Sequence, residues 1–132
     1  SKTIKEWVNG KISPIDQINE HASFTKLFSK KDGEINWKLP AETISSRIRA
    51  LDPWPGSYTY SDQKLLKIIS VSFENDSNLD IGQINFDQNI SIGTKKGKII
   101  VHKLQLEGKK RLNSKEFMRG NSFLNGKILG MR

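Results

Sequence analysis

The sequence contains no cysteine, which excludes disulfides and every metal site or nucleophile built on a thiolate. It has two histidines, His21 and His102, which stand 81 positions apart and share no metal-ligand spacing. No apolar run approaches the roughly 18 residues that a membrane-spanning helix needs, and no signal-peptide pattern opens the chain. These absences predict a cytoplasmic protein with no membrane partner.

The common motifs of catalysis are also missing. The sequence has no glycine-rich phosphate loop, no H-E-x-x-H zinc motif and no G-x-S-x-G nucleophile elbow. Its 14 Asp and Glu residues are scattered, and none forms a close pair in an apolar setting that would raise a carboxyl pKa. The residues alone therefore predict no catalytic residue and no metal ligand, and they favour a binding module over an enzyme.

What the sequence does contain is an uneven distribution of charge, with a net charge of +8. From Lys95 to Arg132 there are eleven basic residues and two acidic ones, a balance of +9, so the other 94 residues carry −1. One interpretation without a specific function is a solvated basic surface that only aids solubility. The more specific hypothesis is a surface that binds a polyanion; nucleic acid is the first candidate and an acidic membrane the second.

The chain is organised around the corner segment, residues 51–56 (LDPWPG), where a helix ends and a strand begins. Pro53 cannot continue a helix. Residues 54–57 are typical of a type II turn, in which Gly56 supplies the positive φ. Because two prolines hold the large Trp54 ring in place, we expect it to be buried as a wedge between the helix and the sheet.

Helix and linker are predicted before the corner segment. A short helix is expected from Lys2 to Val8, followed by an irregular linker from Lys11 to Lys31 in which His21 lies on the surface. The chain starts without a methionine and inside this helix, which indicates a fragment. A second helix begins at Pro40. Its apolar residues recur at spacings of three and four and form one stripe: Ala41, Ile44, Ile48 and Leu51.

Short strands joined by tight turns are predicted after the corner segment. They cover residues 57–60, 65–73, 84–86, 90–92 and 99–106. In the second strand one face is expected to carry Leu65, Ile69, Val71 and Phe73, and the other face Leu66 and Ile68. His102 should be half-buried in the last strand, and a capping box of Asn113 and Glu116 should open a late helix that ends at Gly120. This order predicts a mainly β fold, a small closed barrel.

Two blocks of the sequence resemble the C-terminal domain of methionyl-tRNA formyltransferases. The first block comprises residues 32–37 (DGEINW), 40–42 (PAE) and 47–56 (RIRALDPWPG). The second comprises residues 104–112 (LQLEGKKRL), Glu116-Phe117 and Gly120. Their order and spacing agree with that family over residues 30 to 130.

The resemblance implies a Greek-key barrel of the OB type, joined to a Rossmann-like catalytic domain. That family transfers a formyl group from 10-formyltetrahydrofolate to methionine on initiator tRNA. Its catalytic residues and folate-binding loop belong to the upstream domain, and no segment here matches them. We therefore expect residues 1–31 to be the end of a catalytic-domain helix plus an interdomain linker, and residues 32–132 to be a tRNA-binding domain without catalytic activity or a cofactor of its own. The expected partners are initiator tRNA and the missing catalytic domain, and the expected state is a monomer.

The residues predicted to contact tRNA are basic and fall in three groups. They are Arg47 and Arg49 on the helix, Lys95, Lys96 and Lys98 in one turn, and Lys109, Lys110 and Arg111 in another. The two turns border opposite ends of the same predicted strand, and contacts to phosphates would position RNA without reading bases. The alternative for the whole chain is the accessory domain of a sugar-nucleotide N-formyltransferase, which binds no nucleic acid. The basic C-terminal third of the chain favours the tRNA-binding domain over this alternative.

Overall fold

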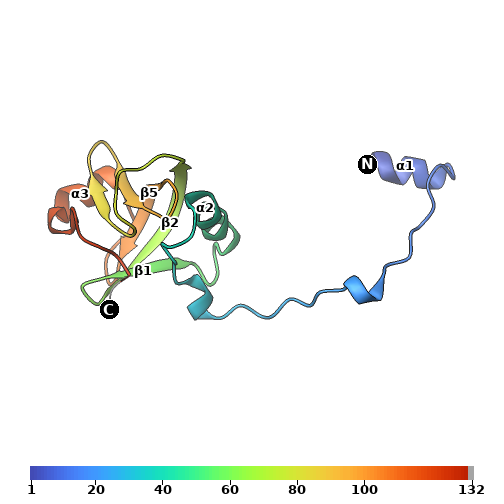
Figure 1. Ribbon diagram of the computed structural model, residues 1–132, viewed down its shortest axis with the longest axis horizontal. Helices are drawn as coiled ribbons and strands as arrows, with labels where there is room; N and C mark the ends of the chain where they lie inside the picture. Colours follow the sequence, from blue (N-terminus) through green and yellow to red (C-terminus); the bar gives the residue numbers. More distant parts are fainter. Residues whose placement is uncertain (131–132) are drawn as a thin grey trace.

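Six strands form one antiparallel sheet in the computed structural model, which describes residues 1–130 (Figure 1). They are β1 (Ser57–Ser61), β2 (Lys64–Glu74), β3 (Ile84–Phe86), β4 (Ile90–Gly93), β5 (Lys98–Leu106) and β6 (Leu112–Asn113). The strand order is β1-β2-β5-β4-β3, with β6 paired to β5. Since β3, β4 and β5 are neighbours in sequence and β2 returns to lie beside β5, the topology is a Greek key. The predicted mainly β fold is confirmed.

A β-bulge decides which residues of β2 face the core. The pairing of β2 with β5 shifts register on both sides of Ser70. An extra residue reverses the alternation of side chains along a strand. The residues of β2 that face the core therefore change phase at the bulge, and they are Leu66, Ile68, Val71 and Phe73. The prediction that placed Leu65 and Ile69 on the same face as Val71 is wrong for this reason.

The same irregularity places His102 on the surface. The pairing with β2 steps from Lys103 to Val101 and leaves His102 between them without a partner in β2. Its side chain is exposed, and its Nε2 lies 3.0 Å from the Ser72 hydroxyl. The predicted half-buried position is therefore wrong, because the strand that carries His102 is not regular at that point.

The curled sheet is closed by a segment that belongs to none of its strands. Within residues 1–130, the edge strands β1 and β3 form no ladder with each other. Instead, the closing segment, residues 126–130, spans the gap between them. Its Leu129 amide donates to the Gly82 carbonyl at 2.9 Å, and its Gly130 amide donates to the Tyr60 carbonyl at 2.9 Å. The barrel is therefore closed by this segment and not, as the prediction implied, by strand pairing. Residues 131 and 132, the end of the predicted domain, lie outside the described residues.

Helix α2 (Ala41–Ala50) packs on β2 and β5 and supplies much of the core. All four residues of its predicted stripe are buried. Trp37, which precedes the helix, is 5 % exposed, and its Nε1–H donates to the Thr59 hydroxyl at 3.1 Å. Helix α3 (Ser114–Gly120) has the predicted capping box, in which the Asn113 side chain accepts from the Glu116 amide.

Trp54 is 58 % exposed, so the prediction of a buried wedge is wrong. The Gly56 amide donates to the Leu51 carbonyl at 2.9 Å, and this bond closes the corner segment into a loop that stands outside the helix–sheet contact. The Asp52–Pro53 and Trp54–Pro55 peptide bonds are cis, and Gly56 has the predicted positive φ, 76°. The ring that lies in the core beside α2 belongs to Trp37 instead.

Helix α1 (Lys2–Val8) and a long extended segment lead away from the sheet (Figure 1). Two short 3₁₀ turns interrupt this segment, η1 (Asn19–His21) and η2 (Lys30–Gly33). The apolar side of α1 is uncovered, with Trp7 61 % and Val8 80 % exposed. His21 is on the surface as predicted. Within residues 1–130, no helix is both long and apolar enough to cross a membrane.

Unfolding experiments can test that Trp37 is buried and that Trp54 is exposed. Trp37→Ala should lower the free energy of unfolding by about 3–5 kcal/mol, since it removes a buried ring. Trp54→Ala should lower it by less than about 1 kcal/mol, as expected for an exposed side chain. Denaturant melts of the two variants provide the comparison. A larger loss in the Trp54 variant than in the Trp37 variant would contradict this assignment.

Candidate nucleic-acid interface

The basic turn at residues 94–98 is held rigidly against two other parts of the domain. The Ala41 amide, at the start of α2, donates to the Lys96 carbonyl at 3.0 Å, and the Lys95 amide donates to the Trp37 carbonyl at 3.2 Å. Inside the turn, the Thr94 hydroxyl is 2.8 Å from the carbonyl oxygens of Lys96 and Gly97. The Lys95 and Lys96 side chains are exposed. The backbone of this turn is therefore fixed while two of its cations face solvent.

Lys98 differs from the other two lysines of that turn. Its Nζ lies 3.0 Å from a carboxylate oxygen of Glu74, and its side chain is only 28 % exposed. Lys98 and Glu74 are paired across the β2–β5 ladder, so the ion pair follows from strand register. Part of the charge of Lys98 is thus neutralised within the protein.

The second basic turn, residues 107–111, projects from the end of β5. Its base is tied to β2, because the Glu107 amide donates to the Leu65 carbonyl at 2.8 Å. The Gln105 side chain donates to the Lys109 carbonyl at 2.8 Å. Lys109, Lys110 and Arg111 are exposed, and no ion pair within residues 1–130 involves them. All three cations of this turn face solvent unpaired.

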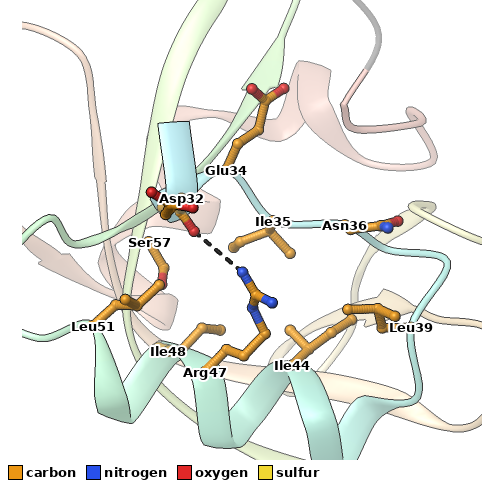
Figure 2. A pocket seen from close by; sticks show the side chains of 11 residues that line it. Asp32, Glu34, Ile35, Asn36, Leu39, Ile44, Arg47, Ile48, Leu51 and Ser57 are labelled. Atoms are coloured by element: carbon orange, nitrogen blue, oxygen red, sulfur yellow. Dashed lines mark hydrogen bonds between the residues drawn. The ribbon is translucent and has the colours of Figure 1, made fainter. Parts of the chain in front are cut away.

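Arg47 and Arg49 lie on α2, but both are engaged by the protein itself. Arg47 reaches from the helix to the Asp32 carbonyl, with its Nη2 at 3.3 Å, as Figure 2 shows. Arg49 donates to the hydroxyls of Ser45 and Ser46, each at 3.3 Å. Both side chains remain largely exposed. These contacts agree with ordinary helix-surface roles for the two arginines.

The pocket beneath Arg47 is too small for a ligand. It lies between α2 and residues 32–36, and both polar and apolar side chains line it, among the latter Ile35, Ile44 and Ile48 (Figure 2). Its volume of about 10 Å³ is comparable to that of one water molecule. It is a packing gap where the start of the domain meets the helix.

Asp32 ties the extended N-terminal segment to this region. Its carboxylate accepts hydrogen bonds from the Ser29 hydroxyl at 2.7 Å and the Ser29 amide at 2.8 Å, and from Lys26 Nζ at 3.2 Å. These donors favour the charged form and lower the pKa of Asp32 to about 2. The turn η2 therefore keeps its carboxylate ionised throughout the physiological pH range.

The sequence prediction missed two further basic residues, which lie on α3. Lys115 and Arg119, together with His102 and the acidic Glu116, line an open pocket of about 410 Å³. Their spacing of four on one helix face is the signal that could have found them. No ion pair within residues 1–130 involves Lys115 or Arg119. In the same described part, no group of three His, Cys, Asp or Glu side chains is placed to hold a metal.

Comparison with known proteins identifies the family. Residues 27–122 match the family of the formyl transferase C-terminal domain, and this match covers most of the chain. The chain therefore belongs to that family.

The relatives that it resembles are methionyl-tRNA formyltransferases. The chain is 38 % identical to the Rickettsia bellii protein over 111 residues, which covers 83 % of this chain and 36 % of that protein. It is 32 % identical to the Lachnospira eligens protein (98 % of this chain, 44 % of that protein) and 36 % identical to the Clostridium acetobutylicum protein (97 % and 42 %). The chain thus spans about two-fifths of the length of these relatives.

Solved structures share the fold at low identity. The crystal structure of HypX from Aquifex aeolicus in complex with tetrahydrofolic acid has a TM-score of 0.61 and 16 % identity, over 99 % of this chain and 26 % of HypX. A HypX variant gives a TM-score of 0.61 and 16 % identity, over 96 % and 23 %. This likeness establishes the fold alone.

The two basic turns should respond differently to a methyl group at their glycines. Gly97 and Gly108 have φ values of 78° and 72°, so alanine costs about 1–2 kcal/mol of strain at either position. At Gly97, however, a Cβ would lie 2.1 Å from the Glu74 carbonyl oxygen, whereas at Gly108 nothing lies within 4 Å. Gly97→Ala should therefore lower the free energy of unfolding by about 1–3 kcal/mol more than Gly108→Ala. Equal losses in denaturant melts would show that the first turn is as free as the second.

Proposed function

We propose that this chain is the tRNA-binding C-terminal part of a methionyl-tRNA formyltransferase that acts in translation initiation in the cytoplasm. The proposal rests on one observation: the tRNA-modifying role in the names of the relatives agrees with the distribution of positive charge in this chain. The relatives are named methionyl-tRNA formyltransferases, and the excess positive charge of this chain lies in its last third. A surface that contacts the tRNA backbone accounts for both.

The cations best able to contact tRNA are those that no other group of the protein already engages. Five of the eight predicted residues are exposed, and their side chains make neither an ion pair nor a hydrogen bond within residues 1–130: Lys95, Lys96, Lys109, Lys110 and Arg111. They occupy turns that border the two ends of β5, which is nine residues long. At roughly 3.3 Å per residue, this strand separates the turns by about 25–30 Å, a distance that suits two contacts along an RNA backbone. Lys98, Arg47 and Arg49 should contribute less to tRNA binding, because other groups of the protein already engage them.

The chemistry of formyl transfer belongs, in this proposal, to a catalytic domain upstream of this chain. That domain would use 10-formyltetrahydrofolate as the donor. The uncovered apolar side of α1 is consistent with a neighbouring domain of the same polypeptide, since an isolated short helix gains little stability by itself. The present chain then holds the tRNA while the upstream domain reacts with its methionine.

Removal of the projecting cations tests the RNA contact. Changing Lys109, Lys110 and Arg111 together to Ala should weaken the binding of initiator and elongator tRNA alike, because phosphate contacts do not depend on base sequence. Each contact contributes roughly 0.9 to the slope of log K against log salt for a duplex, so the slope should flatten by about 2–3. Filter binding or fluorescence anisotropy over a salt series measures both effects.

A matched control removes the same charge from elsewhere. Lys2, Lys5 and Lys11 lie in the N-terminal part of the chain, away from the sheet. Changing these three to Ala should leave tRNA affinity close to that of the parent. If both triple variants lose affinity equally, only net charge matters. If the 109–111 variant binds as tightly as the parent at low salt, the turn is merely solvated, and a sugar-nucleotide enzyme becomes the better assignment.

The division of labour predicts that this chain alone is inactive. Incubated with 10-formyltetrahydrofolate and methionyl-tRNA, it should produce no formyl-methionine above the blank, because it carries no constellation of catalytic groups. A full-length methionyl-tRNA formyltransferase in the same assay is the positive control. Turnover by the pure chain would refute the proposed separation of binding from catalysis.

A further inference from the structure

Trp54 differs from the other exposed apolar residues of the sheet domain in its setting. A single exposed hydrophobic side chain is common and needs no explanation. This ring, however, lies between two prolines in a loop that a hydrogen bond closes from Leu51 to Gly56. It is 58 % exposed in that loop. The protein thus presents a large, flat ring whose backbone position is fixed.

Beside Trp54, the corner segment borders a small recess of about 60 Å³ that carries excess positive charge. Its walls include Pro53 and Pro55 in the corner, Lys67 and Ile69 on β2, Arg111 in the projecting turn, and Ile48 on α2. Asp52 is the single carboxylate that lines it. No ion pair within residues 1–130 involves Lys67 or Arg111. Two cations therefore face a recess with one opposing charge.

The outer face of the neighbouring strands extends this surface with two further rings. Lys67 is the cross-strand partner of Tyr58, so their side chains stand on the same face of the sheet. Tyr58 and Tyr60 pack edge to face, with ring centroids 5.7 Å apart. Both tyrosines are half-buried. Lys67 therefore connects this aromatic surface to the recess, which Ile48, Ile68 and Ile69 also line.

We propose that Trp54, Lys67 and Arg111 bind an unpaired RNA nucleotide, with the base stacked on the Trp54 ring and the phosphate held between the two cations. Aromatic rings beside basic side chains are the usual platform for single-stranded nucleic acid. An apolar protein partner would leave the two cations buried and unpaired, which is costly. The proposal rests on the proposed function and adds to it: contacts at residues 95–96 and 109–110 hold the backbone of paired RNA, and this site takes a base that is out of the helix.

Fluorescence can show whether a base reaches Trp54. In a Trp7→Phe background, emission comes from Trp37, which is 5 % exposed, and from Trp54. Single-stranded oligouridylate should quench this emission, because a stacked base is in contact with the indole. The quenching should vanish in the Trp7→Phe, Trp54→Phe double variant, while the buried Trp37 emission remains. Equal quenching in both variants would overturn the proposal.

Affinity measurements separate stacking from general RNA binding. With oligouridylate as the probe, Trp54→Ala should weaken binding roughly five-fold to a hundred-fold, and Trp54→Phe should weaken it less. With a blunt-ended RNA duplex of equal phosphate number, Trp54→Ala should bind as the parent does, because the bases are already stacked on each other. Lys67→Ala should weaken oligouridylate binding without changing tryptophan emission in the free protein.

The outcomes distinguish this inference from the proposed function. If Trp54→Ala leaves oligouridylate affinity unchanged while the 109–111 variant loses duplex and tRNA binding, the stacking site is wrong and the tRNA-binding role stands. If Trp54→Ala weakens single-stranded and duplex RNA equally, the ring does not select an unpaired base, and the inference also fails. If the parent chain binds neither probe nor tRNA, both proposals fall together.

Discussion

The buried indole of Trp37 is the contact on which the rest of the domain depends. It donates to Thr59 on β1, and Gly82 and Gly130 lie close against its ring. The carbonyl of the same residue accepts the Lys95 amide. One residue therefore joins the approach to α2, the first strand, the closing segment and a basic turn. Because interiors are close-packed, loss of this ring would remove contacts from all of these parts at once.

The local features of the fold could be predicted from sequence because each has a local physical cause. The stripe on α2 follows from its spacing, and the capping box follows from Asn113 and Glu116. The tight turn between β1 and β2 places Asp62 and Gln63 at positive φ, where a tight turn between two strands was predicted. In all these cases the successive residues that determine the structure are within four positions of each other.

Features that depend on distant partners were predicted poorly. Trp37 and Trp54 both lie near prolines, and only the tertiary fold shows which of them is in the core. The bulge at Ser70 depends on pairing with a strand about thirty residues later, so the alternation of β2 was misjudged. Likewise, the site prediction treated the three lysines of one turn as equivalent, whereas strand register pairs Lys98 with Glu74. Sequence located the basic turns, but the fold determined which cations face solvent.

The closing segment has a consequence for the solution behaviour of the domain. Unpaired edge strands expose rows of backbone donors and acceptors and act as templates for association with other chains. Here, residues 126–130 bridge the β1 side and the β3 side at once, through Tyr60 and Gly82. A proteolytic cut in the exposed stretch at 125–126 would therefore uncover both sides of the seam together. The resistance of this domain to aggregation then depends on a short segment that contributes no strand to its sheet.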